Sequence, residues 1–317
     1  MERPVVYACK NQNRELRLRS SSGGVFYALA QEVINHGGVV FGARFNENWE
    51  VVHSCCDEVS ELQAFLGSKY VQSCLGNVFI QVKEILDGNR VVLFTGTPCQ
   101  ISGLKGYLNR DYKNLVLVDF VCHGVPSPKV WKDYLLENFD ITKIKNISFR
   151  EKTDGWKKFS LRVDSDKKSY RNNLQKDWYL KGFLKNIYLR PSCYECAFKG
   201  YERQANITLA DFWGVEKVLP EFYDEDGVSL LLINDKRGQE IWKTVEDQFI
   251  CQEGPVKKAL EKNSAMFKSP IRPVGRNKFF STDGTVQQRV RTITGDYFIA
   301  KVIKKLKKIL HLERKVV

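Results

Sequence analysis

The sequence predicts a fold between the α/β and α+β classes: an N-terminal α/β half with buried parallel strands, a mixed or antiparallel second half and a C-terminal amphipathic helix. Three observations support this. Helix-like and strand-like segments alternate over the first 125 residues, polar-faced strands follow, and the last segment has apolar residues at helical spacing. We expect three regions, at residues 1–125, 126–254 and 255–317.

The first region contains helices followed by buried strands. Gly24 to His36 has helical apolar spacing and runs into Gly37-Gly38, after which VVFGARF is typical of a strand. Further along, we expect a helix, a buried strand, a helix and a buried strand at residues 78–86, 91–96, 99–108 and 114–122. The alternation indicates a parallel sheet.

The second region has a different pattern. KNISFREK and KKFSLRVDS indicate an antiparallel pair of strands around Asp154-Gly155, and DWYLKGFLKN indicates a helix after it. Beyond these we expect strands at residues 207–212 and 228–234 and a helix at residues 236–248.

The composition is that of a globular protein, with 317 residues, 43% hydrophobic and 27% charged. No run approaches the roughly 18 to 20 apolar residues of a membrane span, and the N-terminus has no apolar signal core, so we expect a cytoplasmic location. In that reducing compartment, nine cysteines indicate metal or redox chemistry more than disulfides.

The positive charge is concentrated at the C-terminus. Residues 255–317 hold 16 Lys/Arg and 4 Asp/Glu, a net +12 out of the total of +13, so the remainder is nearly neutral. This favours a localised anionic partner, and we expect no nucleic acid. Residues 297–312 have lysines between apolar residues at helical spacing, which indicates either peripheral binding to an anionic membrane surface at its inner face or a helix packed on the body.

The strongest local motif is PSCYECAFKG, in which Cys193 and Cys196 form a C-x-x-C loop. Two intervening residues allow both thiolates to bind one metal centre. A redox disulfide and two unrelated buried thiols are the alternatives.

Two more cysteines follow buried strands. Cys99 comes after VVLFTGTP and Cys122 after LVLVDFV, so adjacent parallel strands would place both at one carboxyl edge, where such sheets bind ligands. Buried thiols that act as small hydrophobic groups are the alternative. The remaining cysteines lack this setting, and we expect them to be structural: Cys9, Cys55, Cys56, Cys74 and Cys251.

Several polar segments suit a phosphate. The loop Ser20–Gly24 precedes a helix and offers amides, hydroxyls and the positive helix end, although serine and glycine are also ordinary there. GSKYVQS adds Ser68, Lys69 and Ser73. His123 suits a proton donor or a loop hydrogen bond, and Asp211 in ADFWG suits a residue that orients a cofactor.

These motifs occur in one order that resembles the coenzyme F420 hydrogenase/dehydrogenase beta-subunit family, from about Val5 to Asn234. The matching segments are ACKN, SSSGGVFYALA, GGVVFGA, GSKYVQS, LFTGTPCQ, VDFVCHGVPSP, ISFREKTDGW, SCYECAFK and ADFWG. The resemblance implies an FAD that exchanges electrons with an organic substrate and with a 4Fe-4S cluster. It further implies that residues 1–125 bind the flavin and that residues 126–254 contribute cluster ligands.

Carried onto this sequence, the resemblance implies that the cluster ligands are Cys99, Cys122, Cys193 and Cys196. His123 becomes the candidate catalytic residue. The residues expected to bind the flavin or its phosphates are Ser21, Ser22, Gly23, Gly24, Ser68, Lys69, Ser73, Thr95, Gly96, Thr97 and Asp211.

One departure from the family pattern concerns the N-terminus. Many members begin with a ferredoxin-like domain with two cluster motifs, whereas Cys9 is the only cysteine in the first fifty residues here. We therefore expect electrons from a separate ferredoxin, another redox subunit or a reduced nicotinamide. The expected function is an FAD- and 4Fe-4S-dependent oxidoreductase acting on a small or glycan-linked substrate, with a role in cell-surface polysaccharide biosynthesis. The alternatives are an electron-transfer or assembly subunit without its own substrate, and a structural-zinc protein on the same fold.

Overall fold

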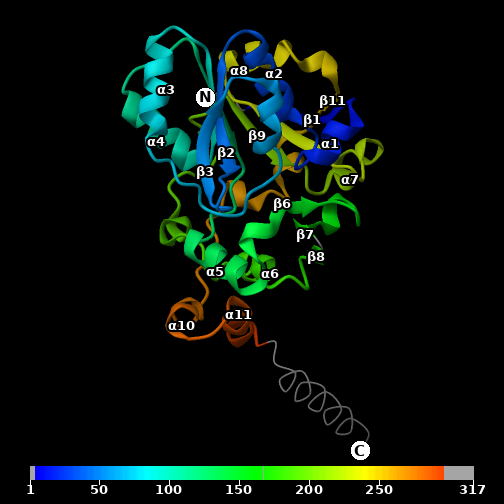
Figure 1. The fold of residues 1–317 in the computed structure, drawn as a ribbon. Helices are drawn as coiled ribbons and strands as arrows, with labels where there is room; N and C mark the ends of the chain where they lie inside the picture. Colours follow the sequence, from blue (N-terminus) through cyan, green and yellow to red (C-terminus); the bar gives the residue numbers. More distant parts are fainter. Residues whose placement is uncertain (1–3, 167, 296–317) are drawn as a thin grey trace, which may run out of the picture.

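The computed structural model describes residues 4–166 and 168–295, which form a large mixed sheet with helices on both faces and a smaller antiparallel sheet beside it (Figure 1). The strand order of the large sheet is β11-β1-β10-β9-β5-β4-β2-β3. Its strands are β1 Val5–Asn11, β2 Val39–Phe45, β3 Val51–Cys56, β4 Val92–Gly96, β5 Leu115–Phe120, β9 Ile207–Asp211, β10 Ser229–Ile233 and β11 Phe249–Glu253.

The central strands β2, β4, β5 and β9 are parallel, whereas the strands toward both edges are antiparallel. Strands β4 and β5 are adjacent and parallel, as expected from the sequence, with Phe94 opposite Leu117 and Gly96 opposite Asp119. Their carboxyl ends therefore lie at the same edge. This architecture confirms the predicted fold class.

Helices cover both faces of the large sheet. On one face lie α2 (Val25–Asn35) and α8 (Lys236–Lys243), and on the other lie α3 (Val78–Asp87) and α4 (Pro98–Leu108). The sequence sets where α4 begins, because Pro98 takes the first helical turn and the Gln100 side chain accepts a 2.9 Å hydrogen bond from the Thr97 N–H.

The chain between β5 and β9 forms most of the smaller part, drawn in green in Figure 1. Its elements are α5 Pro128–Asn138, β6 Ile144–Glu151, β7 Ser160–Ser165, β8 Ser169–Asn173 and α6 Trp178–Leu184. Trp131 lies at its centre, with ring centroids 4.8 Å from Phe149 and 4.9 Å from Tyr179. Two later helices, α10 (Arg276–Ser281) and α11 (Val286–Thr294), pack on this core.

Some local predictions differ from the structure. The helix predicted at residues 236–248 ends at Lys243, and a short 3-10 turn occupies residues 246–248. Strands β1, β3, β8 and β11 were not predicted, and neither were the short helices α1 Arg14–Arg19, α7 Val215–Val218 and α9 Val256–Leu260. The large sheet takes strands from both sides of residue 125, and the regional boundaries at residues 125 and 254 stay predictions.

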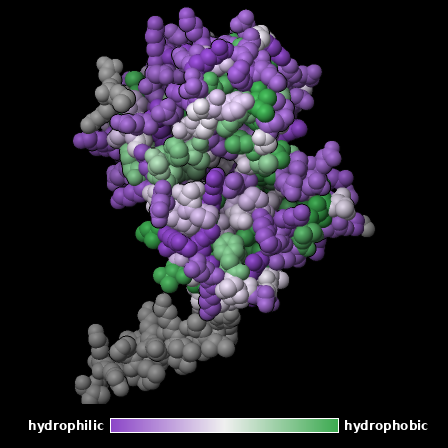
Figure 2. All heavy atoms as spheres, turned by 90° about the vertical axis from the view of Figure 1, so that its left-hand side faces the viewer, coloured by the Kyte–Doolittle hydropathy of each residue, from purple (hydrophilic) through white to green (hydrophobic). Residues whose placement is uncertain are grey.

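On the face shown in Figure 2, hydrophobic residues gather mainly across the middle of the molecule, and the upper edge is hydrophilic. Within residues 4–166 and 168–295, no helix has the length and apolarity to cross a bilayer. The basic segment at residues 297–312 lies outside the described residues, so its predicted membrane contact stays a prediction.

Candidate functional site

A cavity of about 950 Å³ lies between the carboxyl edge of the large sheet and the smaller part. Its walls include the ends of β4 and β5, the loop before α2 and side chains of β6 and α6. The volume is at the upper end of the range of about 300–1,000 Å³ for small-molecule and cofactor sites. The cavity is large enough for a dinucleotide-sized ligand.

Nearly all residues predicted to bind the flavin line this cavity. They are Ser21, Ser22, Gly24, Ser68, Lys69, Ser73, Thr95, Gly96, Thr97 and Asp211. Gly23 does not line it but packs between β1 and β10, where an added Cβ would lie 2.1 Å from the Cys9 carbonyl oxygen and 2.8 Å from the Ser229 nitrogen. Only glycine allows the loop to approach the sheet this closely.

The serines of the loop are held by hydrogen bonds between hydroxyls. Ser21 bonds Ser68 at 2.8 Å, and Ser22 bonds Ser229 at 2.8 Å. The Ser20 hydroxyl is buried and has no partner among the described residues. Helix α2 begins directly after the loop, so its first amides and positive end lie beside these hydroxyls. The arrangement suits an anionic group such as a phosphate.

Lys69 is held close to this loop by main-chain carbonyls. Its Nζ donates to Ala64 O at 3.0 Å and to Leu66 O at 2.8 Å. Burial lowers the pKa of Lys69 to about 7, because the charged form loses hydration. An anion in the cavity would oppose this effect and favour the charged ammonium.

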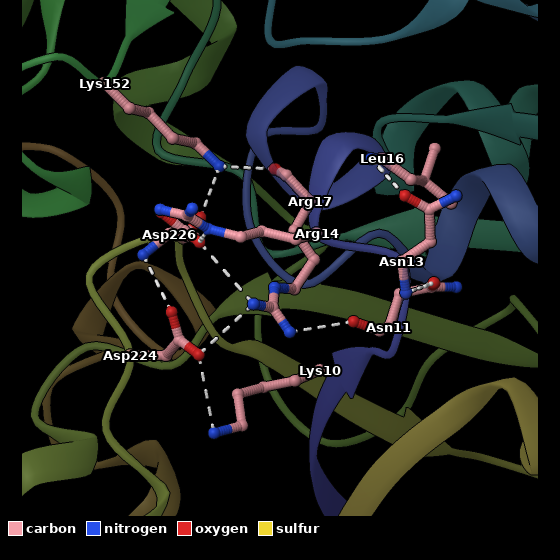
Figure 3. A network of polar contacts seen from close by, with 9 residues as sticks. All are labelled: Lys10, Asn11, Asn13, Arg14, Leu16, Arg17, Lys152, Asp224 and Asp226. Carbon is pink, nitrogen blue, oxygen red and sulfur yellow. Dashed lines mark hydrogen bonds and ion pairs between the residues drawn. The ribbon is translucent and has the colours of Figure 1, made fainter.

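A polar network fixes helix α1, which precedes the serine loop (Figure 3). Arg17 lies 3.5 Å from both Asp224 and Asp226, and Arg14 lies 2.6 Å from Asp226. Lys152, on the loop after β6, donates to the main-chain oxygens of Arg17 at 2.8 Å and Asp226 at 2.7 Å. The network therefore ties the serine loop to both parts of the molecule.

A second cavity, of about 210 Å³, adjoins the first. The four cysteines predicted as cluster ligands line it: Cys99, Cys122, Cys193 and Cys196. They come from three segments, namely the start of α4, the loop after β5 and the loop at residues 191–200, which we call the cysteine loop. We call this second cavity the cysteine cavity. The Cys193 N–H donates to Arg190 O at 2.9 Å and the Cys196 N–H to Ser269 Oγ at 3.0 Å, which hold the cysteine loop in place.

The four thiols share a cavity without converging on a single point. Among the described residues, no three His, Cys, Asp or Glu side chains form a group that could hold one metal ion. A tetrahedral zinc site needs every sulfur about 2.3 Å from one ion. A 4Fe-4S cluster has four irons with one thiolate each, so its ligands surround a larger object. The donor number and type and the shared cavity fit a cluster.

Burial raises the pKa of two of these thiols, that of Cys122 to about 12, because a thiolate there would lose its hydration. Metal binding requires thiolates, so their negative charge needs compensation. Three cations line the same cavity, namely Arg190, Lys199 and Arg203. Lys199 donates to Cys122 O at 2.8 Å and to Ala265 O at 2.7 Å.

His123 lines both cavities. Its Nε2 lies 2.6 Å from Asn186 Oδ1, and its ring makes an edge contact with Phe183 at 5.4 Å between centroids. Burial lowers the pKa of His123, which favours the neutral imidazole. Its catalytic role stays a prediction.

Two buried ion pairs were missed by the sequence analysis. Arg150 pairs with Asp211, lines the large cavity and is 5% exposed, and its guanidinium lies over Phe159 at 4.5 Å. Arg203 lies near Asp119. An acidic residue within the apolar run LVLVDFV was the available signal for Asp119. Asp211 was singled out in ADFWG, but nothing local marks Arg150 as its partner.

Two of the cysteines predicted to be structural lie together away from both cavities. Cys9 and Cys251 face each other on β1 and β11, with sulfurs 3.3 Å apart. Both are free thiols. Neither of these two cysteines lines the cysteine cavity.

The buried side chain of His53 lines the large cavity and should make the stability of the protein depend on pH. It bonds Ser73 Oγ at 2.8 Å and Thr95 O at 3.0 Å, and burial lowers its pKa from 6.5 to about 4. The unfolded chain therefore binds more protons between these values. We expect the native state to lose up to about 3 kcal/mol of stability as pH falls from 6.5 toward 4, with this contribution fully present above pH 6.5.

Urea unfolding of the wild type and of His53→Gln at pH 7.5 and pH 4.5 measures this contribution. The stability difference between the two proteins should shrink by about 2–3 kcal/mol at the lower pH. The same comparison with the exposed His36→Gln controls for general effects of acid. A pH-independent difference at His53 contradicts the assignment.

Part of the residues around both cavities lie in a stretch that matches a known protein family. A family model for the C-terminal part of the coenzyme F420 hydrogenase/dehydrogenase beta subunit matches residues 89–259, more than half of the chain. The chain belongs to this family. The match confirms the resemblance expected from the sequence, and its range includes all four cysteines of the cavity. Membership in this hydrogenase/dehydrogenase family assigns the chain an oxidoreductase-type redox function.

A solved structure shares the fold of this beta-subunit family member. It is a chain of the F420-reducing [NiFe] hydrogenase complex from Methanosarcina barkeri, 16% identical, with a TM-score of 0.56. The similarity covers 84% of the present chain and 90% of the other. No curated protein matches the sequence.

Proposed function

We propose that the chain is an oxidoreductase that uses FAD and one 4Fe-4S cluster to pass electrons between an iron-sulfur donor or acceptor and an organic substrate. One observation carries the proposal: the two cavities share walls, since Cys99, Cys122 and His123 line both. A group held by the cysteines would therefore adjoin a ligand of the large cavity. Such contact is what electron transfer between two cofactors requires.

The cysteine cavity supplies the residues for the cluster. Cys99 and Cys122 approach from the sheet edge. Cys193 and Cys196 approach from a loop that is held by hydrogen bonds from their own N–H groups to Arg190 O and Ser269 Oγ. Lys199 and Arg203 offset the negative charge of four thiolates.

The large cavity supplies the residues for FAD. When bound, the flavin exchanges two electrons with an organic substrate and single electrons with the cluster. Ser21, Ser68 and the first amides of α2 would hold its phosphates. The Arg150–Asp211 pair forms part of the wall of this cavity. His123, held by Asn186, is the candidate for proton exchange with the bound ligand.

The partner and substrate extend this proposal. We propose a separate ferredoxin or redox subunit as the electron donor, which is supported by the relative from Methanosarcina barkeri, a chain of a hydrogenase complex. We further propose a small or glycan-linked substrate from cell-surface polysaccharide synthesis. That assignment is supported by the family resemblance.

Anaerobic purification followed by analysis of iron, sulfide, zinc and flavin tests the proposal. We expect about four irons and one FAD per chain. Stoichiometric zinc without iron would support the structural-zinc alternative instead. Reduction of the flavin by a small metabolite separates an enzyme from an electron-transfer or assembly subunit, which would be reduced only by its protein partner.

We also propose that residues 297–312 bind an anionic membrane surface. The support is the sequence pattern of lysines and apolar residues at helical spacing. A chain truncated after Gly295 should lose co-sedimentation with phosphatidylserine-containing liposomes, while the full chain binds them and not neutral liposomes. Equal binding of both proteins refutes the membrane role.

A further inference from the structure

A buried ion pair links the two cavities. Asp119 is the penultimate residue of β5, lines the large cavity and has a side chain that is 1% exposed. Arg203 precedes β9, lines the cysteine cavity and has a side chain that is 2% exposed. Arg203 Nη1 lies 3.4 Å from Asp119 Oδ2. The pair therefore has its positive end at the cysteines and its negative end at the large cavity.

The pairing of Arg203 is incomplete. The distance of 3.4 Å is long for a charge-assisted hydrogen bond, which is usually about 2.7–2.9 Å. Arg203 Nε and Nη2 are buried and have no hydrogen-bond partner among the described residues. Buried polar groups nearly always have a partner. A guanidinium with two free nitrogens in a cavity lined by four cysteines thus indicates an anionic acceptor in that cavity.

We propose that the Arg203–Asp119 pair biases electron transfer from the flavin toward the cluster. The inference rests on the proposed function. A thiolate-bound cluster is anionic, and one-electron reduction adds a further negative charge, so a buried cation beside it stabilises the reduced form. Hydrogen bonds from Arg203 to cluster sulfur would act in the same direction. Arg203 therefore raises the potential of the cluster.

Asp119 acts on the other cofactor. A carboxylate that lines the large cavity disfavours negative charge on a reduced flavin and so lowers the flavin potential. In the transfer itself, one electron leaves the reduced flavin and enters the cluster, while the ion pair gains and loses nothing. The fixed charges of the pair thus widen the gap between the two potentials.

Potentiometric titration tests the bias, with the cluster followed by electron paramagnetic resonance and the flavin by absorbance. Arg203→Met should lower the cluster potential by an amount equal to a tenfold change in the one-electron equilibrium constant, or about 59 mV. Asp119→Asn should raise the flavin potential more than the cluster potential. Both variants therefore narrow the gap between the cluster potential and the flavin potential. Arg203→Met does so by lowering the cluster potential, and Asp119→Asn does so by raising the flavin potential.

Two further variants serve as controls. Arg203→Lys keeps the charge and should keep most of the gap. Arg190→Met removes a charge from an exposed residue that lines both cavities, and solvent screening should make its effect smaller than that of Arg203→Met. If Arg203→Met does not fold because Asp119 is left unpaired, the double variant Arg203→Met/Asp119→Asn removes both charges and should also narrow the gap.

The outcomes separate the inference from the proposed function. A wild-type chain without iron or flavin contradicts the proposed function. If wild type and variants hold equal iron and flavin and the gap between their potentials is unchanged, the bias is overturned. A shift in Arg190→Met as large as in Arg203→Met also overturns it, because the buried position would then have no special effect.

Discussion

Replacing Cys193 with serine should remove the iron-sulfur cluster. Cys193 lines the 210 Å³ cavity with three other cysteines, and serine supplies no thiolate, so we expect iron to fall from about four atoms per chain toward zero. The broad visible absorbance of the cluster and all electron transfer to an iron-sulfur partner should be lost with it. Iron analysis and anaerobic absorbance spectra measure the change.

The matched control is Cys55→Ser. Cys55 is an exposed free thiol that lines neither cavity, so its replacement should leave iron, flavin and spectra unchanged. Full iron content in Cys193→Ser, or equal loss in both variants, would show that the cavity cysteines are not the ligands.

Replacing Arg150 with methionine should cause the largest loss of stability. The side chain of Arg150 is 4% exposed and that of Asp211 is 15% exposed, so the substitution leaves a mostly buried carboxylate without its partner. Removing one member of a buried pair costs about 3–5 kcal/mol. Because both residues line the large cavity, we also expect flavin retention to fall. Urea unfolding and flavin content after purification measure the two effects.

Two variants test the cause of that loss. The double variant Arg150→Met/Asp211→Asn removes both charges and should recover part of the stability. Lys129→Met breaks an exposed pair with Asp133, in which Lys129 is 80% exposed, and should cost less than about 1 kcal/mol. Equal losses in Arg150→Met and Lys129→Met would contradict the role of burial.

The first half of the fold could be predicted because its sequence is locally consistent. Strands β4 and β5 begin with the apolar runs VLF and LVLV, and Gly, Thr and Pro mark the turn into α4. Their parallel pairing then places Cys99 and Cys122 at one edge. The link from these residues to Cys193 came from the family resemblance, since nothing in the spacing indicates that the later loop returns to the same edge.

The unpredicted features depend on contacts between distant segments. Strands β1 and β11 gain their partners only when residues 5–11 lie between β10 and β11, a pairing that spans most of the chain. Likewise, Arg150 and Asp211 are 61 positions apart, so neither residue carries a local sign of the other. Local patterns predict elements, whereas such pairs are set by the tertiary fold.

Strands β5 and β9 are neighbours, with Val118 opposite Ile207, although about 85 residues separate them. The intervening chain thus leaves the sheet after β5 and re-enters it beside β5, which makes it an insertion between two adjacent strands. Changes within this insert therefore leave the pairing of β5 with β9 in place while they reshape the part of the cavity wall that the insert supplies. Under the proposed function, the insert must also bring Cys193 and Cys196 back to the edge from which it departs.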